Sequence, residues 1–483
     1  MIQNVQAILL AADKSCSLSP EKSKFTEKIC GQELIVYPAK LLASLHIPTT
    51  IIAGTLKETF QEILTHAHAN EIHIASQDPN EGTGHAIMQA CKNLMQEHVL
   101  IMHGDMPLVT SETIERLFSK HIESKAAVSF VVAHNQEPSG HFYGRVVKQE
   151  GNKIKIIPAK DFDGDVNDHC CVDAGIYIVT KQFLSSHIHE IEEQENHKKL
   201  YFTDIIKIAS EKRESISTIQ APFEQIRGIN NFQELWAAEH IKRSELIKNW
   251  MNKGVRFSVP QSVVIDIDVE IGAGSFIGCG VHLLKGTKIG TQCTIQEFCA
   301  ITGSTIANNT TIYSHCIVKD SHIGTGSKIG PFAHITEHST IEEHATIGNF
   351  VEVKRTTIGK KSKAKHLAYL GDASIGNNVN IGAGTITCNH DGTQKHPTTI
   401  KDGAYIGSNN TLVAPITIQE NAFTAAGSTI TMDVPQDALG IGRARQVNKE
   451  GYAQKLRTGK TEQAASFIGA VKTNNDNKLS EGQ

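Results

Sequence analysis

The stretch VVIDIDVEIGAGSFIGCGVHLLKGTKIGTQCTIQEFCAI, residues 263–301, decides the fold of the second half of this chain. An aliphatic residue recurs at every sixth position, and glycine often follows it, as in Ile271-Gly272 and Ile289-Gly290. A period of six fits neither a helix nor a two-sided strand. It is typical of the hexapeptide repeat of a parallel β-helix, in which three repeats make one triangular coil. We therefore predict a prism of stacked aliphatic residues, with the small residue permitting a tight corner. The aliphatic positions are Ile265, Ile271, Ile277, Leu283, Ile289, Ile295 and Ile301.

The same period continues toward the C-terminus. It resumes from Ile323 to Val353 and again from Ile400 to Ile430. Three segments interrupt it, and insertions in solenoids collect on one face and commonly build the binding site. The interruptions are Thr357–Leu370 with its basic KKSKAKH run, the polar loop Asn389–Thr398, and the chain from Arg443 onward.

The first half of the chain alternates short apolar runs with amphipathic stretches, a pattern that predicts βαβ units and a mostly parallel, Rossmann-like sheet. Ligands of such sheets bind at the carboxyl ends of the strands. The expected strands are Val5–Ala11, Thr50–Ala53, His73–Ala75, Val99–His103, Ala127–Val132 and Gly175–Val179. The expected helices are Pro38–Leu45, Leu56–His66, Gly84–Gln96 and Ser111–Ile122.

A long helix is expected between the two halves, because Asn231 and Glu234 form a potential capping box and Gly254 follows the last turn. The fold class is thus α/β followed by all-β. We expect an α/β domain over 1–229, a linker helix over 230–253, a β-helix over 254–457 and a polar, disordered tail over 458–483.

Composition excludes several classes of protein. Of the 483 residues, 40% are hydrophobic and 20% are charged, which excludes a disordered chain. The net charge of −4 argues against a nucleic-acid partner, and no run of 18 apolar residues would span a membrane. Ten scattered cysteines without a C-x-x-C motif or a signal peptide favour a cytoplasmic location. The aromatic content of 6% is low because a prism core is built of Ile, Leu and Val.

Several local motifs resemble one family over the chain up to about residue 455. They are GTGHA (82–86), GDMPL (104–108), FYGR (142–145), TDII (203–206), GNFVEVK (348–354), HLAYLGDASIG (366–376) and NIGAGTITCN (380–389). The family is the bacterial bifunctional N-acetylglucosamine-1-phosphate uridyltransferase / glucosamine-1-phosphate N-acetyltransferase. The resemblance implies a left-handed hexapeptide β-helix, a homotrimer with an acetyl site between subunits, and Mg²⁺, UTP and acetyl-CoA as cofactor and co-substrates.

The N-terminal site is expected to transfer uridyl from UTP to a sugar 1-phosphate, with release of pyrophosphate. Such chemistry needs positive charge and N–H groups directed at the phosphates. Asp105 follows an apolar strand, and its hard oxygen suits Mg²⁺. The resemblance adds Asn230 as second metal ligand and Lys24 as a basic catalytic residue. It also implies uracil contacts by Gln77, Gly82 and Thr83, and a sugar contact by Gly144.

This N-terminal pocket departs from the family at several positions. Asp13 and Ser15 replace the two glycines of the phosphate loop, although glycine is what lets backbone approach phosphate closely. Ser17 replaces an arginine that would clamp the pyrophosphate. Pro158 stands where the family has Glu, and Asp173 where it has Asn. We therefore expect uridyl transfer to be weakened or lost.

The C-terminal site is expected to move an acetyl group from acetyl-CoA to the amine of glucosamine-1-phosphate. A base must take the proton of the amine before it attacks, and histidine titrates in the required range. By resemblance His366 is this base, Asn389 orients the nucleophile or its intermediate, and Lys354 binds the 1-phosphate. The implied sugar contacts are Tyr369, Asn380 and Lys395, and the implied acetyl-CoA contacts are Ser408, Ala426 and Arg443.

Two departures mark this second site: Thr336 replaces a phosphate-gripping arginine, and His390 replaces a tyrosine. We predict a cytoplasmic bifunctional enzyme of UDP-N-acetylglucosamine synthesis that acts on sugar phosphates and nucleotides. One alternative is an acetyltransferase alone, with a degenerate N-terminal domain. Another is a non-catalytic trimeric scaffold, which the joint retention of His366, Tyr369 and Asn389 disfavours.

Overall fold

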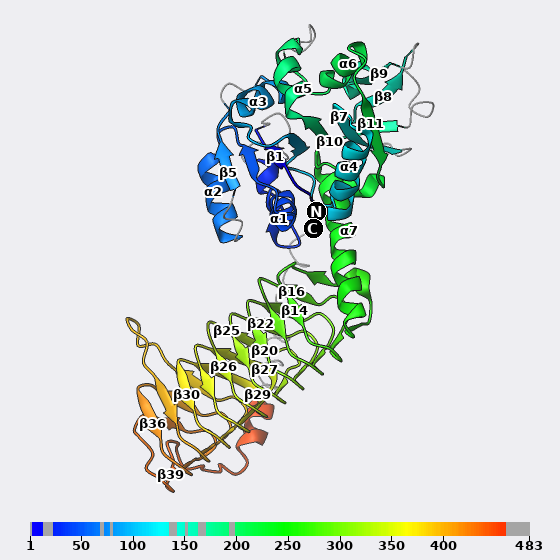
Figure 1. Cartoon of the computed structure of the whole chain (residues 1–483). Coiled ribbons are helices and arrows are strands. Elements are labelled where there is room, and N and C mark those ends of the chain that lie inside the picture. The colour runs from blue at the N-terminus through cyan, green and yellow to red at the C-terminus, as the bar shows by residue number, and fades with distance from the viewer. Residues whose placement is uncertain are drawn as a thin grey trace, which may run out of the picture.

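The computed structural model describes residues 2–12, 23–67, 72–77, 81–134, 143–149, 153–162, 171–192 and 199–459. Figure 1 shows an α/β body, a long helix α7 (Phe232–Asn252) and a stack of short strands that continues away from the body. Both predicted architectures are therefore present in the predicted order. Within the described residues, no helix is long and apolar enough to cross a membrane.

The N-terminal sheet has the strand order β11-β7-β10-β6-β1-β4-β5. Along this path the pairs are parallel except those of β10, which runs antiparallel to both β6 and β7. Two further strands of the same sheet, β8 and β9, extend it from β10 by antiparallel pairs, so the sheet is mixed and its parallel part is β11-β7 and β6-β1-β4-β5. The strands are β1 (Val5–Leu10), β4 (Thr49–Ile52), β5 (Ile72–Ala75), β6 (His98–His103), β7 (Val128–His134), β10 (Cys171–Thr180) and β11 (Ile216–Gln220).

Helices and short strands complete the α/β body. The predicted helix Gly84–Gln96 is too long: α3 ends at Ala90 and passes into a 3₁₀ turn over Cys91–Asn93. The helices are α1 (Val36–Ser44), α2 (Lys57–His66), α3 (Thr83–Ala90), α4 (Ser111–Ser124), α5 (Lys181–His187) and α6 (Asp204–Glu211). The short strands are β2 (Lys28–Ile29), β3 (Gln32–Glu33), β8 (Arg145–Lys148) and β9 (Ile154–Ile157).

Helix α7 connects the two bodies and closes one end of the prism. Asn231 caps its N-terminus by accepting a hydrogen bond from the Glu234 N–H at 2.8 Å. The Glu234 carboxylate does not complete the expected capping box, since it accepts from buried Arg227 at 2.6 Å instead. At the other end, Ile247 joins the aliphatic core of the prism. The helix thus belongs to both hydrophobic cores and fixes the prism to the α/β body.

The prism begins at β12 (Arg256–Phe257) and ends at β39 (Leu439–Gly440), and every named strand pair between them is parallel. Its interior positions are the predicted aliphatic residues, with Ile277, Ile301 and Ile335 fully buried. One face is a separate sheet of nine two- or three-residue strands. It consists of β14 (Glu270–Ile271), β17 (Lys288–Ile289), β20 (Thr305–Ile306), β23 (His322–Ile323), β26 (Thr340–Ile341), β28 (Thr357–Ile358), β30 (Ala373–Ile375), β33 (Thr398–Ile400) and β36 (Ile416–Ile418).

The other two faces carry the strands that matter for the site. Two of these, β27 (Thr346–Lys354) and β29 (Lys363–Gly371), are nine residues long and continue around a corner of the prism. Their register pairs Asn349 with His366 and Glu352 with Tyr369. The shorter strands of this region are β25 (His334–Thr336), β31 (Asn380–Ile381), β32 (Ile386–Cys388), β34 (Tyr405–Ile406), β35 (Thr411–Val413) and β37 (Phe423–Thr424).

One prediction about this half needs correction. The segment Thr357–Leu370 is not an insertion: it forms β28 and β29, and Ala364 and Leu370 take interior positions. The period was obscured because an alanine replaces an aliphatic residue and one corner is a residue shorter. The prediction that a small residue permits the tight corner agrees with the close approach of successive coils at these glycines. A Cβ on Gly348 would lie 1.8 Å from the Lys365 carbonyl oxygen.

One corner of the prism carries a ladder of exposed rings. Phe298, His315, Phe332 and Phe350 lie on successive coils, with neighbouring ring centroids 5.2, 4.9 and 5.3 Å apart and nearly parallel planes. Each has a positive φ, and Leu367 continues the row on the next coil with φ 47°. We call these five residues the ring ladder. Leu367, the last residue of the ring ladder, directly follows His366 in the sequence.

Candidate active sites

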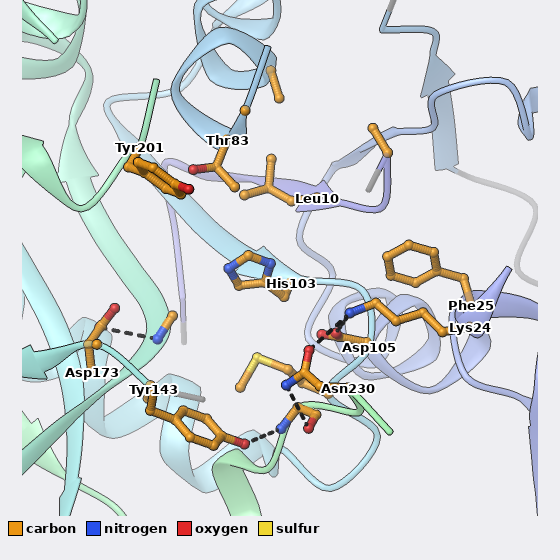
Figure 2. Close-up of a pocket in the computed structure, with 18 of the residues that line it drawn as sticks. Leu10, Lys24, Phe25, Thr83, His103, Asp105, Tyr143, Asp173, Tyr201 and Asn230 are labelled. Carbon is orange, nitrogen blue, oxygen red and sulfur yellow. Dashed lines mark hydrogen bonds and ion pairs between the residues drawn. The ribbon is translucent and has the colours of Figure 1, made fainter. Parts of the chain in front are cut away.

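The pocket of the α/β body opens at the carboxyl ends of β1 and β6, where a sheet of this kind presents its ligands. Figure 2 shows Lys24, Asp105 and Asn230 converging on one side, Thr83 and Tyr201 on the other, and His103 between the two groups. The predicted N-terminal site residues within the described part of the chain line this pocket, with the exception of Pro158. They are Lys24, Gln77, Gly82, Thr83, Asp105, Gly144, Asp173 and Asn230.

Lys24 lies at the centre of the expected metal site. Its ammonium forms a buried ion pair with the Asp105 carboxylate and lies 3.4 Å from the Asn230 Oδ1 atom. The fold therefore directs two oxygen ligands from distant parts of the sequence at one positive charge. Tyr143 helps to position the segment that carries Asn230, since its hydroxyl accepts a hydrogen bond from the Gly228 N–H at 2.8 Å.

The oxygen donors of Asp105 and Asn230 suit Mg²⁺, which prefers hard ligands and keeps several waters or substrate phosphates in its shell. Two protein ligands are enough for an ion that also binds a triphosphate. Because the Lys24 ammonium occupies the region between the two oxygens, a metal ion at this point would require Lys24 to move toward the phosphates. The described residues contain no group of three or more His, Cys, Asp and Glu side chains that would hold a metal by themselves.

The expected uracil contacts lie at the N-terminus of α3. The Gln77 amide donates to the Gly82 carbonyl oxygen at 3.2 Å, which joins the end of β5 to the start of the helix. Gly82 has φ 106°, and a Cβ there would lie 2.5 Å from the Leu200 carbonyl oxygen. The Thr83 hydroxyl accepts from the Phe202 N–H at 3.0 Å. These residues form a rigid wall of the pocket.

Asp173 is buried in the wall of the pocket opposite Lys24. It accepts hydrogen bonds from the Tyr177 hydroxyl and, at 3.1 Å, from the Gly175 N–H. Burial raises the pKa of its carboxyl group to about 6, although both hydrogen bonds act in the opposite direction. Gly144 lies beside it, because the Asp173 N–H donates to the Gly144 carbonyl oxygen at 2.9 Å.

The other positions at which the N-terminal site departs from the family are not found among the described residues of this pocket. Pro158 precedes a 3₁₀ turn and does not line the pocket. Asp13, Ser15 and Ser17 lie outside the described residues. Conversely, the pocket wall includes His103, Tyr143, Lys199 and Tyr201, which sequence reasoning did not select. His103 was detectable, since it directly precedes the GDMPL motif at the end of an apolar strand.

In the prism, His366 lies at the bend of β29 and faces the neighbouring coil. Its Nδ1 atom is 2.7 Å from the Asn349 Oδ1 atom. A carboxamide oxygen only accepts hydrogen bonds, so the neutral imidazole that fits this contact carries its proton on Nδ1 and has a lone pair on Nε2. This is the tautomer that a general base needs, and the imidazole is exposed at the corner.

A second cluster lies on the same coils and contains three predicted residues, Lys354, Tyr369 and Asn389. The Asn389 amide donates to the Asp372 carboxylate and lies 3.5 Å from the Tyr369 hydroxyl. Arg355 holds the same carboxylate through two contacts, of 2.6 and 2.9 Å. The pKa of Asp372 is lowered mainly by the Arg355 guanidinium, with smaller effects of Asn389 and of Lys395.

Glu337 completes this cluster at its exposed end. Its carboxylate lies 2.7 Å from the Lys354 Nζ atom and also contacts Arg355. Thr336, the residue that replaces the family arginine, is buried next to it. Sequence reasoning missed Glu337, Asp372 and Asn349, although the last two lie inside the motifs HLAYLGDASIG and GNFVEVK. The sequence alone does not show which residues of successive coils are register partners, so these three residues could not be identified from it.

The remaining predicted residues extend along the prism. Asn380 pairs with Lys363 of β29 on one side and Tyr405 of β34 on the other. Lys395 forms an isolated antiparallel bridge with His390 in the loop Asn389–Thr398, so that this predicted interruption is confirmed as a protrusion. These residues come from coils adjacent to the cluster of Asn389 and Asp372.

The predicted acetyl-CoA residues follow His366 in a single column. Strand register places His366, Ala383, Ser408 and Ala426 at the same corner of successive coils, each two residues beyond a paired interior position. Backbone hydrogen bonds join them, for example from the Gly427 N–H to the Ser408 carbonyl oxygen at 2.8 Å. Ser408 and Ala426 are exposed, and the chain leaves the last coil at Arg443 beside the same corner.

The α/β body with a pocket at the ends of its strands, followed by a hexapeptide prism, is the architecture of a transferase with nucleotidyltransferase and acyltransferase domains. Residues 7–199 match the family described as MobA-like NTP transferase domain, and residues 259–357 match the GMPPB C-terminal domain. Curated relatives match nearly the whole chain. The "Bifunctional protein GlmU" of Thermodesulfovibrio yellowstonii is 38% identical over 458 residues, covering 94% of this chain and 100% of that relative.

Two further relatives with the same printed name agree. The protein of Exiguobacterium sibiricum is 37% identical, covering 92% of this chain and 99% of its own, and that of Thermosipho africanus is 39% identical, covering 94% and 98%. The chain therefore belongs to the bifunctional GlmU family, the enzymes that make UDP-N-acetylglucosamine by acetyl transfer and uridyl transfer. The predicted fold class, family and enzyme class are confirmed, with acetyl-CoA and UTP as co-substrates.

Proposed function

We propose that acetyl transfer takes place at the corner of the prism formed by β27 and β29, with His366 as general base. The observation that carries this proposal is the column that runs from His366 to Ser408 and Ala426. The Nε2 atom takes a proton from the amine of glucosamine-1-phosphate as the amine forms a C–N bond to the thioester carbonyl. The C–S bond then breaks, and the departing thiolate of coenzyme A takes that proton back from Nε2 and leaves as the thiol.

The sugar and the cofactor approach the base from two sides. Lys354, Tyr369 and Asn389 lie on the side of Asp372 and bind the acceptor sugar phosphate, together with Asn380 and Lys395. Ser408, Ala426 and Arg443 lie along the corner column and bind acetyl-CoA. Arg443, which is exposed where the chain leaves the last coil, pairs with a phosphate group of the cofactor.

The pocket of the α/β body carries out uridyl transfer. Asp105 and Asn230 would hold Mg²⁺, which would neutralise charge on the triphosphate. Lys24 moves its ammonium from Asp105 to the phosphates when substrate enters. Gln77, Gly82 and Thr83 hold the uracil base, and Gly144 contacts the sugar.

This second reaction is slowed by the altered phosphate loop. Asp13 introduces a carboxylate where a triphosphate binds, and Ser17 supplies no charge in place of an arginine. An enzyme with Asp13→Gly and Ser17→Arg is expected to turn over UTP and N-acetylglucosamine-1-phosphate faster than the natural chain. Pyrophosphate release and coenzyme A release, measured on the same preparation, distinguish the bifunctional enzyme from an acetyltransferase alone. Full uridyl turnover by the natural chain, with no gain in the variant, would refute a slowed site.

The proposed assembly is a cytoplasmic homotrimer with the acetyl site at subunit contacts. The ring ladder is solvent-exposed on the single chain, and so are Ile441, Val447, Tyr452 and Leu456 in the segment after the last coil. Apolar surface of this extent is typical of a protein contact. The proposed units are 1–229, 230–253 and 254–457. The proposed tail, 458–483, lies outside the described residues except for 458 and 459, which end a short helix. Sedimentation equilibrium of the full chain tests the trimer.

A further inference from the structure

Lys354, the cation that the proposed function assigns to the acceptor phosphate, and its neighbour Arg355 are already paired with carboxylates. Lys354 pairs with Glu337 at 2.7 Å, and Arg355 contacts both Glu337 and Asp372. Two positive side chains thus meet two negative ones, and the formal charge of this group cancels. A dianionic phosphate that enters the group must compete with a carboxylate for the same N–H donors.

The two carboxylates are held very differently. Asp372 accepts two contacts from Arg355 and one from Asn389, and only 18% of its side chain is exposed. Glu337 has 47% of its side chain exposed, and its partners Lys354 and Arg355 come from the next coil. Exposed ion pairs contribute little to stability, whereas a two-point contact in a partly buried site is stronger. Glu337 is therefore the carboxylate that can leave.

The backbone places Glu337 where it can exchange with solvent. It lies in the turn between β25 and β26, and both Glu337 and His338 have positive φ angles, of 53° and 60°. The residue before it, Thr336, is buried and carries no charge. The turn therefore offers Lys354 the carboxylate of Glu337, and the preceding residue, Thr336, adds no charge.

We propose that Glu337 is a built-in competitor of the acceptor phosphate: it occupies Lys354 and Arg355 in the free enzyme and swings into solvent when the sugar phosphate binds. The inference rests on the proposed role of Lys354 as the phosphate ligand. It makes Glu337 a specificity-determining residue, since only a ligand with more negative charge than one carboxylate displaces it efficiently. A neutral amino sugar leaves the ion pairs in place and binds without this competition.

The test compares Glu337→Gln with the natural full-length enzyme in acetyl transfer. Glutamine keeps the size and hydrogen-bonding capacity of the side chain but removes its charge. The KM for glucosamine-1-phosphate and the inhibition constant of inorganic phosphate are expected to fall about two- to fivefold, with kcat unchanged. Glu337→Ala should also lower both constants, which would show that the effect does not depend on the glutamine side chain.

A matched control comes from the far end of the prism. Glu270 and Lys288 form a similar exposed pair between neighbouring coils, at 3.0 Å, and Glu270→Gln should leave both constants unchanged. A KM that is unchanged or raised in both Glu337 variants overturns the proposal. Lys354→Ala separates the two hypotheses: if it raises the KM while the Glu337 variants do not lower it, only the competitor is wrong. If Lys354→Ala leaves the KM unchanged, the phosphate site itself is wrong and the competitor with it.

Discussion

The Nδ1 atom of His366 lies 2.7 Å from the Oδ1 atom of Asn349 on the preceding coil. Because the amide oxygen can only accept, this contact keeps the Nδ1–H proton in place and leaves Nε2 free of a proton. The pair is set by strand register, since the two residues are direct partners in β27 and β29. Two predictions follow from this relationship.

Replacing His366 by alanine should lower acetyl transfer by about a hundredfold to ten-thousandfold, the usual contribution of a general base. Uridyl transfer by the same protein should not change, because that pocket belongs to the other domain. Coenzyme A release and pyrophosphate release, measured side by side, check both statements. Normal acetyl transfer by His366→Ala would exclude this residue as the base.

Asn349→Asp should move the acidic limb of the pH–rate profile for acetyl transfer to higher pH by about one unit, because a carboxylate stabilises the imidazolium next to it. Asn349→Ala should lower kcat without that shift, since it removes the contact and adds no charge. A profile of Asn349→Asp that overlays the natural one would show that Asn349 does not act through His366.

Asp105→Asn should nearly abolish uridyl transfer and leave acetyl transfer intact. The variant keeps the shape of the side chain but removes the charge that pairs with Lys24 in a buried site. Removal of this charge should also lower the free energy of unfolding of the α/β body by up to about 3 kcal/mol, because the Lys24 ammonium then faces a neutral amide. Pyrophosphate release at temperatures where circular dichroism shows a folded variant separates the two effects.

The buried Asp173 carboxyl makes stability depend on pH. Its pKa of about 6 in the folded protein exceeds the ordinary value of 3.8, so the unfolded chain loses this proton at lower pH than the folded one. The folded state is therefore penalised increasingly between pH 4 and pH 6 and by a constant amount above, at most about 3 kcal/mol. Asp173→Asn should raise the melting temperature at pH 8, and the gain should shrink as the pH falls toward 4. An equal gain at every pH would mean that charge is not the cause.

His121 gives the opposite dependence. Its ring is buried, with Nδ1 2.8 Å from the Ser129 hydroxyl and Nε2 3.1 Å from His98, and burial lowers its pKa to about 4. The unfolded chain takes up this proton below pH 6.5 while the folded protein does not, so stability is lost between pH 6.5 and pH 4. The loss amounts to about 1.4 kcal/mol per pH unit. His121→Gln should flatten this part of the curve in urea titrations, and an unchanged slope would assign it to other groups.

The prism was predictable because each hexad must deliver one residue to its interior, which leaves a repeated aliphatic in the sequence. The prediction failed at Thr357–Leu370, where Ala364 fills an interior position that elsewhere holds isoleucine. In the α/β body, the strands β1, β4, β5, β6, β7 and β10 were predicted, whereas β8, β9 and β11 were missed. The burial of β8 and β9 is partial and irregular, so they lack a clear apolar pattern.

The site residues were predictable only one at a time. A motif identifies His366 or Asp105, but nothing in the order of the chain shows that Asn349 or Lys24 is its neighbour. Lys24 and Asp105 are separated by 81 positions, and their contact depends on how strands β1 and β6 pair. The charged group of Glu337, Lys354, Arg355 and Asp372 likewise depends on the stacking of three coils.

The corner column has a consequence for how this enzyme tolerates changes in length. Thr387 and Leu412 are register partners although 25 positions separate them, whereas Leu412 and Ile430 are 18 apart. The extra residues leave at a corner, and the next strand resumes in register. Neighbouring coils lie about 4.8 Å apart, so the base and the cofactor contacts are spaced in whole steps of that height. Insertions at corners are therefore harmless to the spacing, but removal of one complete coil between His366 and Ala426 would shorten the cofactor groove by one step while leaving every face correctly oriented.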